Sequence, residues 1–439
     1  MLNINKLQKY KQMKIINRNI APAFKLIEKI NINKPKIIKL HRSIPVYVLN
    51  AGTEDVIRME VVFNAGSKFS NFPLVATITN LMLNEGTKTR SSKVLAEQLD
   101  YYGAYLNLDS NRDFAETTLY TLGKHFEKTL DLFTDILVNS SFPDEELSVL
   151  LENKKQKFKI DEQKVKTLAI KKFNEVIFGK EHFYGRNVQL LDYDLITVQQ
   201  LKDFYKRLYN KNNCKVIISG KITDEVLKRL ENYFNVNDFD NLNNSFIPQN
   251  ITSSTDKKHF VEKAGAVQSS IRIGKPLINK HHKDYAGLQI INTILGGYFG
   301  SRLMSNLRED KGYTYGVGSI VASLVGTGYF SVVCEVGVNT TKSAIGEIYK
   351  EIERLIDKQV SNNELKRVRN YMLGEFVRLF DGPFAQAEAL RSVIDFNLDE
   401  KYYENYLYIL RNITTSEIQQ LATKYLQPET MYEVVAGKM

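Results

Sequence analysis

The same order of predicted elements occurs twice along the chain, and this repeat constrains the fold more than any other feature. In the first half, VIRMEVVFNAG from Val56 alternates apolar and polar residues, as a half-buried strand does. An apolar helix is predicted over residues 74–83, with a stop at Gly86. In the second half, AVQSSIRIG from Ala266 is the predicted strand and YAGLQIINTILGG is the predicted helix, which stops near Gly296. The two halves therefore begin alike.

The later segments of the two halves correspond as well. VLAEQLDYYGAYLN matches LMSNLREDKGYTYG, so that Gly103 corresponds to Gly312 after a second predicted helix in each half. VQQLKDFYKRLYNKNNCKVIISGK and EIQQLATKYLQPETMYEVVAGK each predict a helix followed by a strand that ends in Gly-Lys. A repeat of about 200 residues indicates a duplicated domain, because solenoid units are much shorter. The sequence predicts an α+β protein with two duplicated α/β sandwich domains, each an antiparallel-rich sheet packed with helices.

Composition places the boundaries between these domains. The linker predicted at residues 236–257 overlaps the run NVNDFDNLNNSFIPQNITSSTD, residues 235–256, which is rich in Asn, Ser and Asp. The first domain is predicted at 39–235 and the second at 258–439. Residues 1–38 form a predicted N-terminal extension, whose first 26 residues include six basic residues and no acidic one.

Composition also excludes several classes of partner. No apolar run approaches the roughly 20 residues of a membrane-spanning helix, so no membrane partner is predicted. The net charge of +10 is a small excess of 60 basic over 50 acidic residues, without a nucleic-acid motif, so no nucleic acid is predicted. Cys214 and Cys334 form neither a disulfide framework nor a C-x-x-C pair, which favours the cytoplasm. The mitochondrial matrix and the periplasm stay open as alternatives.

One short segment, LREDKGYTYG, combines groups that could hold a peptide. Arg308 offers a planar fork of donors, and Tyr315 adds a hydroxyl beside it. The residues alone favour a structural interpretation, in which Arg308 pairs with Glu309 or Asp310 and the tyrosines alternate along a strand. Both interpretations stay open at this level.

The longer segment LGGYFGSRLMSNLREDKGYTYGVGS resembles the second-domain signature of the inverzincin metallopeptidases of the pitrilysin and insulinase type. The resemblance is to their short two-domain, processing-peptidase-like subgroup, and it extends over nearly the whole chain from about Lys39. It implies a clam-shaped subunit in which Arg308 and Tyr315 are catalytic residues contributed in trans to a partner's zinc site. By the same resemblance, the expected substrate-binding residues are Tyr313, Gly296, Gly297 and Ser301.

The resemblance also exposes an absence. The family's H-x-x-E-H motif supplies two zinc ligands and the base that activates water. Its five positions correspond here to residues 77–81, where Thr77, Asn80 and Leu81 replace the ligands and the base. The third ligand would fall near Gln156 or Lys157. We therefore expect no metal in this chain and zinc in a partner subunit.

Taken with the resemblance, the sequence predicts a metal-free partner subunit of a heterodimeric or heterotetrameric zinc metallopeptidase. Such a chain would be inactive alone and would help an H-x-x-E-H subunit to cleave short or unfolded peptides. Two alternatives stay open. One is a non-enzymatic scaffold subunit, and the other is a stand-alone peptide-binding homodimer.

Overall fold

A computed structural model describes residues 32–40, 44–236, 249–399 and 401–438, together with positions 18, 27 and 30. Residues 32–439 form one compact unit. Most of the predicted extension (1–38) and the middle of the predicted linker (237–248) lie outside the described residues. The first described strand, β1, begins at Lys36, inside the predicted extension.

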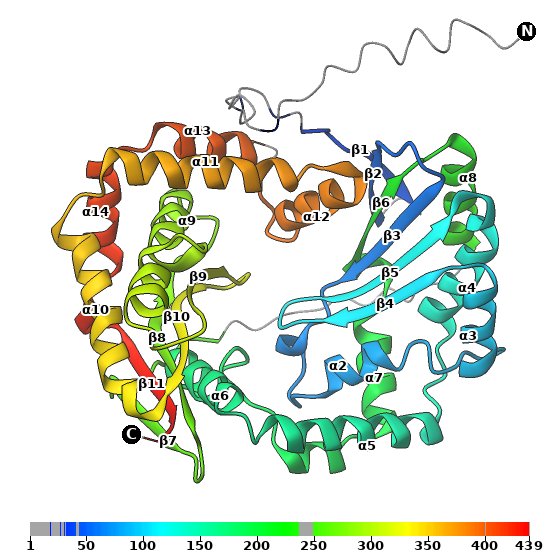
Figure 1. The fold of residues 1–439 in the computed structure, drawn as a ribbon. Helices are drawn as coiled ribbons and strands as arrows, with labels where there is room; N and C mark the ends of the chain where they lie inside the picture. Colours follow the sequence, from blue (N-terminus) through cyan, green and yellow to red (C-terminus); the bar gives the residue numbers. More distant parts are fainter. Residues whose placement is uncertain are drawn as a thin grey trace, which may run out of the picture. The chain divides into compact units, whose positions relative to one another are not determined.

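The first half forms a six-stranded mixed sheet with the strand order β1-β2-β6-β3-β5-β4 (Figure 1). β2 and β6 are parallel, whereas the other neighbours are antiparallel. Its strands are β1 (Lys36–Leu40), β2 (Ile44–Asn50), β3 (Val56–Phe63), β4 (Tyr105–Ser110), β5 (Ala115–Leu122) and β6 (Cys214–Gly220).

The second half repeats this topology in a five-stranded sheet with the order β7-β11-β8-β10-β9. β7 and β11 form the parallel pair, and the other neighbours are antiparallel. Its strands are β7 (Lys258–Glu262), β8 (Gln268–Leu277), β9 (Val317–Ser323), β10 (Gly328–Gly337) and β11 (Tyr432–Gly437). The predicted duplication and the α+β class are therefore confirmed, with β1 as the strand that has no counterpart among the described residues of the second half.

Helices pack against both sheets. Those of the first half are α2 (Val75–Leu81), α3 (Ser92–Tyr101), α4 (Phe126–Asn139), α5 (Asp144–Asp161), α6 (Val165–Phe178), α7 (Val198–Leu208) and α8 (Asp224–Val236). Those of the second half are α9 (Tyr285–Asn292), α10 (Thr341–Asp357), α11 (Asn362–Arg378), α12 (Gly382–Ile394), α13 (Tyr402–Asn412) and α14 (Thr415–Tyr425). Short 3-10 turns are η2 (Ser67–Phe69), η3 (Gly123–His125), η4 (Leu190–Asp194), η5 (Lys211–Asn213), η8 (Val338–Thr340) and η9 (Pro428–Thr430).

The repeated helices begin in the same way. α7 and α14, which precede the equivalent strands β6 and β11, each start at a threonine in a capping box: Thr197 with Gln200, and Thr414 with Glu417. Two segments predicted as α-helix are wound differently. η6 (Thr293–Gly297) and η7 (Met304–Asp310) are π-helical. Wide π turns often occur at functional sites.

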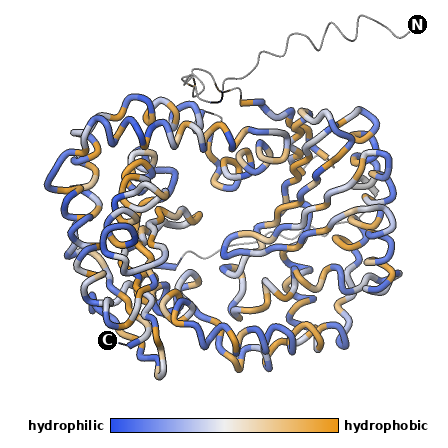
Figure 2. Tube along the Cα trace, in the orientation of Figure 1, coloured by the Kyte–Doolittle hydropathy of each residue, from blue (hydrophilic) through white to orange (hydrophobic). Residues whose placement is uncertain are grey.

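Each half sends one helix onto the sheet of the other half. α6, from the first half, packs on β8 and β11, where Phe173, Ile177 and Phe178 join a buried cluster with Val434. α12, from the second half, packs on β2 and β6, where Ala387 contacts the first sheet. Figure 1 shows α12 beside the strands of the first sheet, and Figure 2 shows the apolar residues concentrated along the strands. The two sequence repeats are thereby interlocked.

This exchange explains why β3 differs from its prediction. A half-buried strand would expose one face, but Arg58 and Glu60 on the polar face are only 4% and 0% exposed. The apolar residues of β3, among them Met59 and Val61, pack into the main core on the opposite face. The polar face is buried because α12 covers it.

An ion network secures α12 to that face. Arg391 of α12 bonds to Glu60 at 2.7 Å and to Glu116 through both terminal guanidinium nitrogens. Its Nε lies 3.1 Å from Asp395, which also accepts Lys215 at 2.6 Å. Buried charges are tolerated only when paired in this way.

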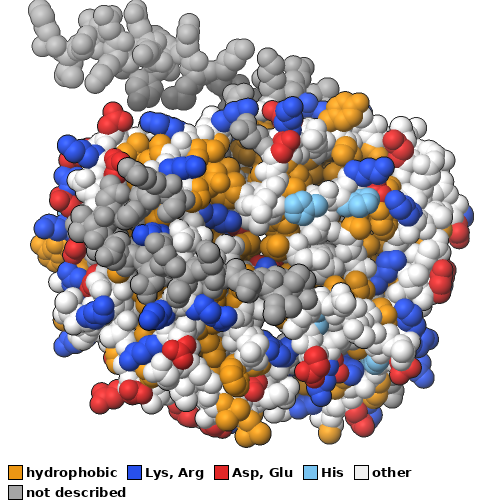
Figure 3. Space-filling view, turned by 180° about the vertical axis from the view of Figure 1, so that it is seen from behind, with side chains coloured by type: hydrophobic (Ala, Val, Ile, Leu, Met, Phe, Trp, Pro, Cys, Tyr) orange, Lys and Arg blue, Asp and Glu red, His pale blue; other side chains and the backbone are white. Residues whose placement is uncertain are grey.

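The surface carries mixed charge. Basic and acidic side chains are interspersed on the face shown in Figure 3. Within the described residues, no helix has both the length and the apolar character needed to cross a membrane.

Glu116 should make stability depend on pH. Burial raises its pKa from 4.5 to about 7, against the opposing effect of Arg391. Below pH 4.5 the carboxyl is protonated in both folded and unfolded chains. Between pH 4.5 and about 7 the unfolded chain loses this proton first, so stability falls as the pH rises. From pH 5 to pH 8, wild type should lose more free energy of unfolding than Glu116→Gln, by up to about 3 kcal/mol.

Urea unfolding at the two pH values measures this difference. Glu97→Gln, on the exposed surface of α3, is the matched control and should follow wild type. Equal losses in wild type and Glu116→Gln would contradict the prediction.

Candidate functional site

α2 contains the five positions that the family resemblance assigns to the zinc motif, and its buried residue Asn80 serves packing. Asn80 is fully buried. Its amide nitrogen donates to the backbone oxygens of Asp109 at 2.7 Å and Glu116 at 3.2 Å, and its oxygen accepts from the Tyr209 hydroxyl at 3.0 Å. Burial raises the pKa of Tyr209, which keeps the proton that it donates. Asn80 therefore joins α2 to β4, β5 and the end of α7, and it has no free group for a water.

The other two motif positions offer no zinc ligand. The Thr77 hydroxyl accepts from the Ser110 hydroxyl at 3.2 Å, and Leu81 is apolar. Thr77 lines a cleft of about 650 Å³ that also contains Arg112 and Arg391. Arg186 lines the same cleft, and its three arginines outnumber the two aspartates, Asp113 and Asp395, so the local charge disfavours a further cation.

The carboxylates near the expected third ligand are used by neighbours. Gln156 on α5 donates to Glu152 at 2.7 Å, and Glu162 pairs with Lys171 at 2.6 Å. Across the described parts of the chain, no group of three or more His, Cys, Asp or Glu side chains could hold a metal ion. The residues present at the family's metal position do not fit zinc.

Arg308 and Tyr315 do come together. The guanidinium carbon of Arg308, on η7, lies 5.2 Å from the centre of the Tyr315 ring and 4.7 Å from that of Phe299. We call these three residues the arginine cluster. Ring faces attract a cation without using its N–H donors. The sequence prediction missed Phe299, although it stands inside the quoted GGYFG segment.

The two rings of the arginine cluster are exposed to solvent, and Arg308 is half-buried. Tyr315 is 91% exposed and Phe299 is 62% exposed, which is unusual for large aromatic side chains. The structural interpretation of Arg308 was wrong, since no ion pair joins it to Glu309 or Asp310, all three of which are described. Its donors are thus available to a ligand.

The two tyrosines also differ from that interpretation. Tyr313 and Tyr315 lie in a loop, because β9 begins only at Val317. The loop is held by Thr314, whose hydroxyl oxygen is 2.6 Å from the backbone oxygen of Glu335 and accepts from the Gly316 N–H at 3.1 Å. A loop lets Tyr315 turn back over Arg308, which a regular strand would not.

The remaining candidates divide into surface and packing positions. Gly297 is exposed and Tyr313 is half-buried. Gly296 is buried, and a Cβ there would lie 2.6 Å from the Ser319 nitrogen, so glycine lets η6 approach β9 closely. Ser301 is 1% exposed. In this structure the buried residues Gly296 and Ser301 help to position the backbone that carries the arginine cluster. They are not part of the exposed surface of the cluster.

Two segments of the chain match models of one protein family. Residues 46–182 match the insulinase family (peptidase family M16), and residues 195–372 match the peptidase M16 inactive domain. Together these segments cover most of the chain.

Similar proteins come from several bacteria. An uncharacterized zinc protease of Rickettsia bellii is 22% identical over 91% of this chain and 97% of its own length. A non-peptidase homolog, YmxG, of Helicobacter pylori is 23% identical over 72% of this chain and 74% of its own. A peptidase M16 inactive domain from Pseudomonas fluorescens has a similar fold, with a TM-score of 0.85, 22% identity and coverage of 92% of this chain and 98% of that one.

The role of Asn80 can be tested by Asn80→Asp, which keeps the shape but places a carboxylate against two backbone oxygens. Losing both donations in a buried site should reduce the free energy of unfolding by about 3 kcal/mol or more near neutral pH. The loss should be smaller in acid, where the new carboxyl is protonated. Urea unfolding measures it, with Asn153→Asp on the exposed face of α5 as the control. An unchanged free energy of unfolding in Asn80→Asp would show that the amide does not stabilise the packing of α2.

Proposed function

Because the chain belongs to the insulinase family of peptidases and lacks zinc ligands and base on its first helix, we propose that it is a non-catalytic partner subunit. It pairs with a homologous H-x-x-E-H subunit that holds zinc. Alone it hydrolyses no peptide. The substrates of the complex are short or unfolded peptides.

One observation supports this proposal above the others: the rings of the arginine cluster are exposed, and its donors are unused. In a subunit of purely structural role, an arginine flanked by two solvent-exposed aromatic rings has no evident purpose. In a peptide-binding subunit, the same group presents a fork of donors at a fixed position. Arg308 and Tyr315 would bind the carbonyl oxygen of the peptide bond to be cleaved.

The role of these donors follows from their preorganisation. Charge develops on the carbonyl oxygen during peptide hydrolysis, and donors already in place stabilise that charge without reorganising. The rings of Phe299 and Tyr315 both contact the Arg308 guanidinium group, which limits its rotamers. Gly297 and Tyr313 lie nearby in sequence and would contact the flanking peptide backbone.

The cellular setting proposed is the cytoplasm. Cys214 and Cys334 are both free and buried, and burial raises the pKa of Cys334 to about 11 and of Cys214 to about 12. Such thiols are inert, and a reducing compartment suits them.

Assembly gives the first test. When co-expressed with an H-x-x-E-H homologue encoded in the same genome, the chain should co-purify and elute as a mixed complex, because a specific interface buries at least about 1,000 Å². Size-exclusion chromatography with mass analysis measures this. If each chain forms only self-dimers, the subunit model is wrong and the stand-alone homodimer replaces it.

The donors give the second test, in the mixed complex. Arg308→Ala and Tyr315→Phe should each lower kcat/KM on one fluorogenic peptide by about 10² to 10³, the usual cost of losing a preorganised oxyanion donor. Tyr313→Phe is the control, with a weaker effect expected. Assembly should be unchanged. Activity of both variants within about threefold of wild type, below 1 kcal/mol, would reject the role of the arginine cluster.

A further inference from the structure

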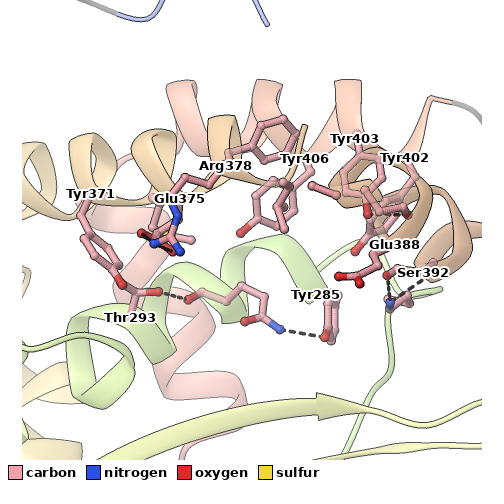
Figure 4. Close-up of a pocket in the computed structure, with 17 residues that line it drawn as sticks. Tyr285, Thr293, Tyr371, Glu375, Arg378, Glu388, Ser392, Tyr402, Tyr403 and Tyr406 are labelled. Carbon is pink, nitrogen blue, oxygen red and sulfur yellow. Dashed lines mark hydrogen bonds and ion pairs between the residues drawn. The ribbon is translucent and has the colours of Figure 1, made fainter. Parts of the chain in front are cut away.

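A second feature of the C-terminal half is a pocket of about 560 Å³ that none of the sequence motifs predicted. It lies among α9, α11, α12 and α13, and its volume is typical of small-ligand sites, which span about 300–1,000 Å³. Figure 4 shows Tyr371 at one end of the pocket and Tyr402 and Tyr403 at the other, with Tyr285 and Tyr406 between them. Six aromatic rings line it, those of Tyr285, Tyr371, Phe376, Tyr402, Tyr403 and Tyr406.

The rings are held by one another and by the backbone. Phe376 stacks on Tyr406 at 5.8 Å and meets Tyr403 edge-on at 5.7 Å. The Tyr403 hydroxyl donates to the backbone oxygen of Ala389 at 2.9 Å, and the Tyr285 hydroxyl accepts from Gln289 at 2.7 Å. A pocket with such fixed walls is preorganised for a ligand.

Three tyrosine hydroxyls in the pocket, those of Tyr371, Tyr402 and Tyr406, are left for a ligand among the described residues, and that of Tyr406 lies between the other two. Among the described residues, no hydrogen bond engages the phenol of Tyr406, which Figure 4 shows beside the open space. Burial raises the pKa of Tyr406, so this hydroxyl stays protonated and can donate. A carbonyl oxygen is a suitable acceptor.

The charges of the lining favour an uncharged ligand. Two cationic and two anionic side chains line the pocket, and they balance. Arg378 pairs with Glu375 at 3.0 Å, and Lys280 bonds to the Ser392 hydroxyl at 2.8 Å. Burial lowers the pKa of Lys280 to about 8, which indicates that the pocket disfavours added positive charge. The raised pKa values of Tyr402 and Tyr406 indicate the same for negative charge.

The pocket connects to the arginine cluster through aromatic contacts. Tyr371, at one end of the pocket, contacts Tyr298 with the ring centres 4.8 Å apart and the ring planes tilted by 32°. Tyr298 directly precedes Phe299, which contacts Arg308. The segment 298–299 therefore contacts both the end of the pocket and the arginine cluster.

We propose that this pocket binds an uncharged aromatic side chain of the peptide, together with a backbone carbonyl that accepts from Tyr406. Its selectivity for a substrate class rests on the proposed function, whereas binding itself requires no partner subunit. Aromatic pairing with the walls and exclusion of charged side chains supply the preference.

The chain contains no tryptophan, which permits a direct test with the purified full chain. The probe is the peptide Ac-Ala-Ala-Trp-Ala-Ala-NH2, whose indole emission should shift to the blue and saturate on titration. The matching peptide with Phe in place of Trp should compete at similar concentration. Competing peptides with Lys or Glu at that position should need at least about tenfold higher concentrations to displace the probe.

Two pocket variants and two controls locate the site. Tyr406→Phe, which removes only the hydroxyl, should weaken binding about three- to tenfold. Ala385→Leu, which fills part of the pocket, should weaken it more than tenfold. Tyr408 is exposed on α13, the helix that carries Tyr406, and Ala96 is exposed on α3. Tyr408→Phe and Ala96→Leu should therefore bind the probe like wild type.

The outcomes separate this proposal from the previous one. Equal competition by the Lys and Glu peptides, no saturable shift, or wild-type binding by both pocket variants would overturn the pocket. If the probe binds in the pocket and Arg308→Ala leaves this binding unchanged, the result would support the pocket and count against the carbonyl contact of the arginine cluster. Loss of partner assembly with intact binding would reject only the subunit model.

Discussion

The contact of Arg391 with Glu60 and Glu116 is the interaction on which the rest of the structure depends. These two carboxyl groups lie on a sheet face that would otherwise be hydrated, and Arg391 from the other half of the chain bonds to both, beside Arg58, which lies 3.3 Å from Glu60. Because both carboxyl groups are buried, removing the arginine would leave Glu60 to Arg58, at 3.3 Å, and Glu116 to the Asn111 amide, at 3.3 Å, which costs more than losing a surface pair. The contact thus fixes α12, and with it one wall of the tyrosine-lined pocket.

Much of the fold could be predicted from the sequence, because the duplicated domains share local sequence patterns. Three patterns appear twice along the chain. They are the strand alternation of β3, the Thr-capped starts of α7 and α14, and the Gly-Lys ends of β6 and β11. The exchange of α6 and α12 could not be predicted. Each is an ordinary amphipathic helix whose apolar face is visible in sequence, but which sheet that face covers is decided by tertiary contacts.

The candidate site was predictable in its parts and not in its geometry. The expected loss of ligands at Thr77, Asn80 and Leu81 comes from the family resemblance together with residue type, since none of these side chains supplies a metal ligand or base comparable to His and Glu. The stacking of Phe299 on Arg308 could not be foreseen, because π-helical winding in η7 alters the side-chain directions that an α-helix would give. The tyrosine pocket escaped notice because its members are spread from Tyr285 to Tyr406 without a shared motif.

The reciprocal exchange of helices has a consequence for synthesis on the ribosome. The first sheet emerges complete up to β6 long before α12 is translated, so its charged face must wait in water for Arg391. α6 emerges before either strand that it covers, and its Phe173, Ile177 and Phe178 stay without their final partners over the same interval. Neither repeat can reach its final packing during translation, and the nascent chain is an expected client of chaperones until its last strand, β11, is released.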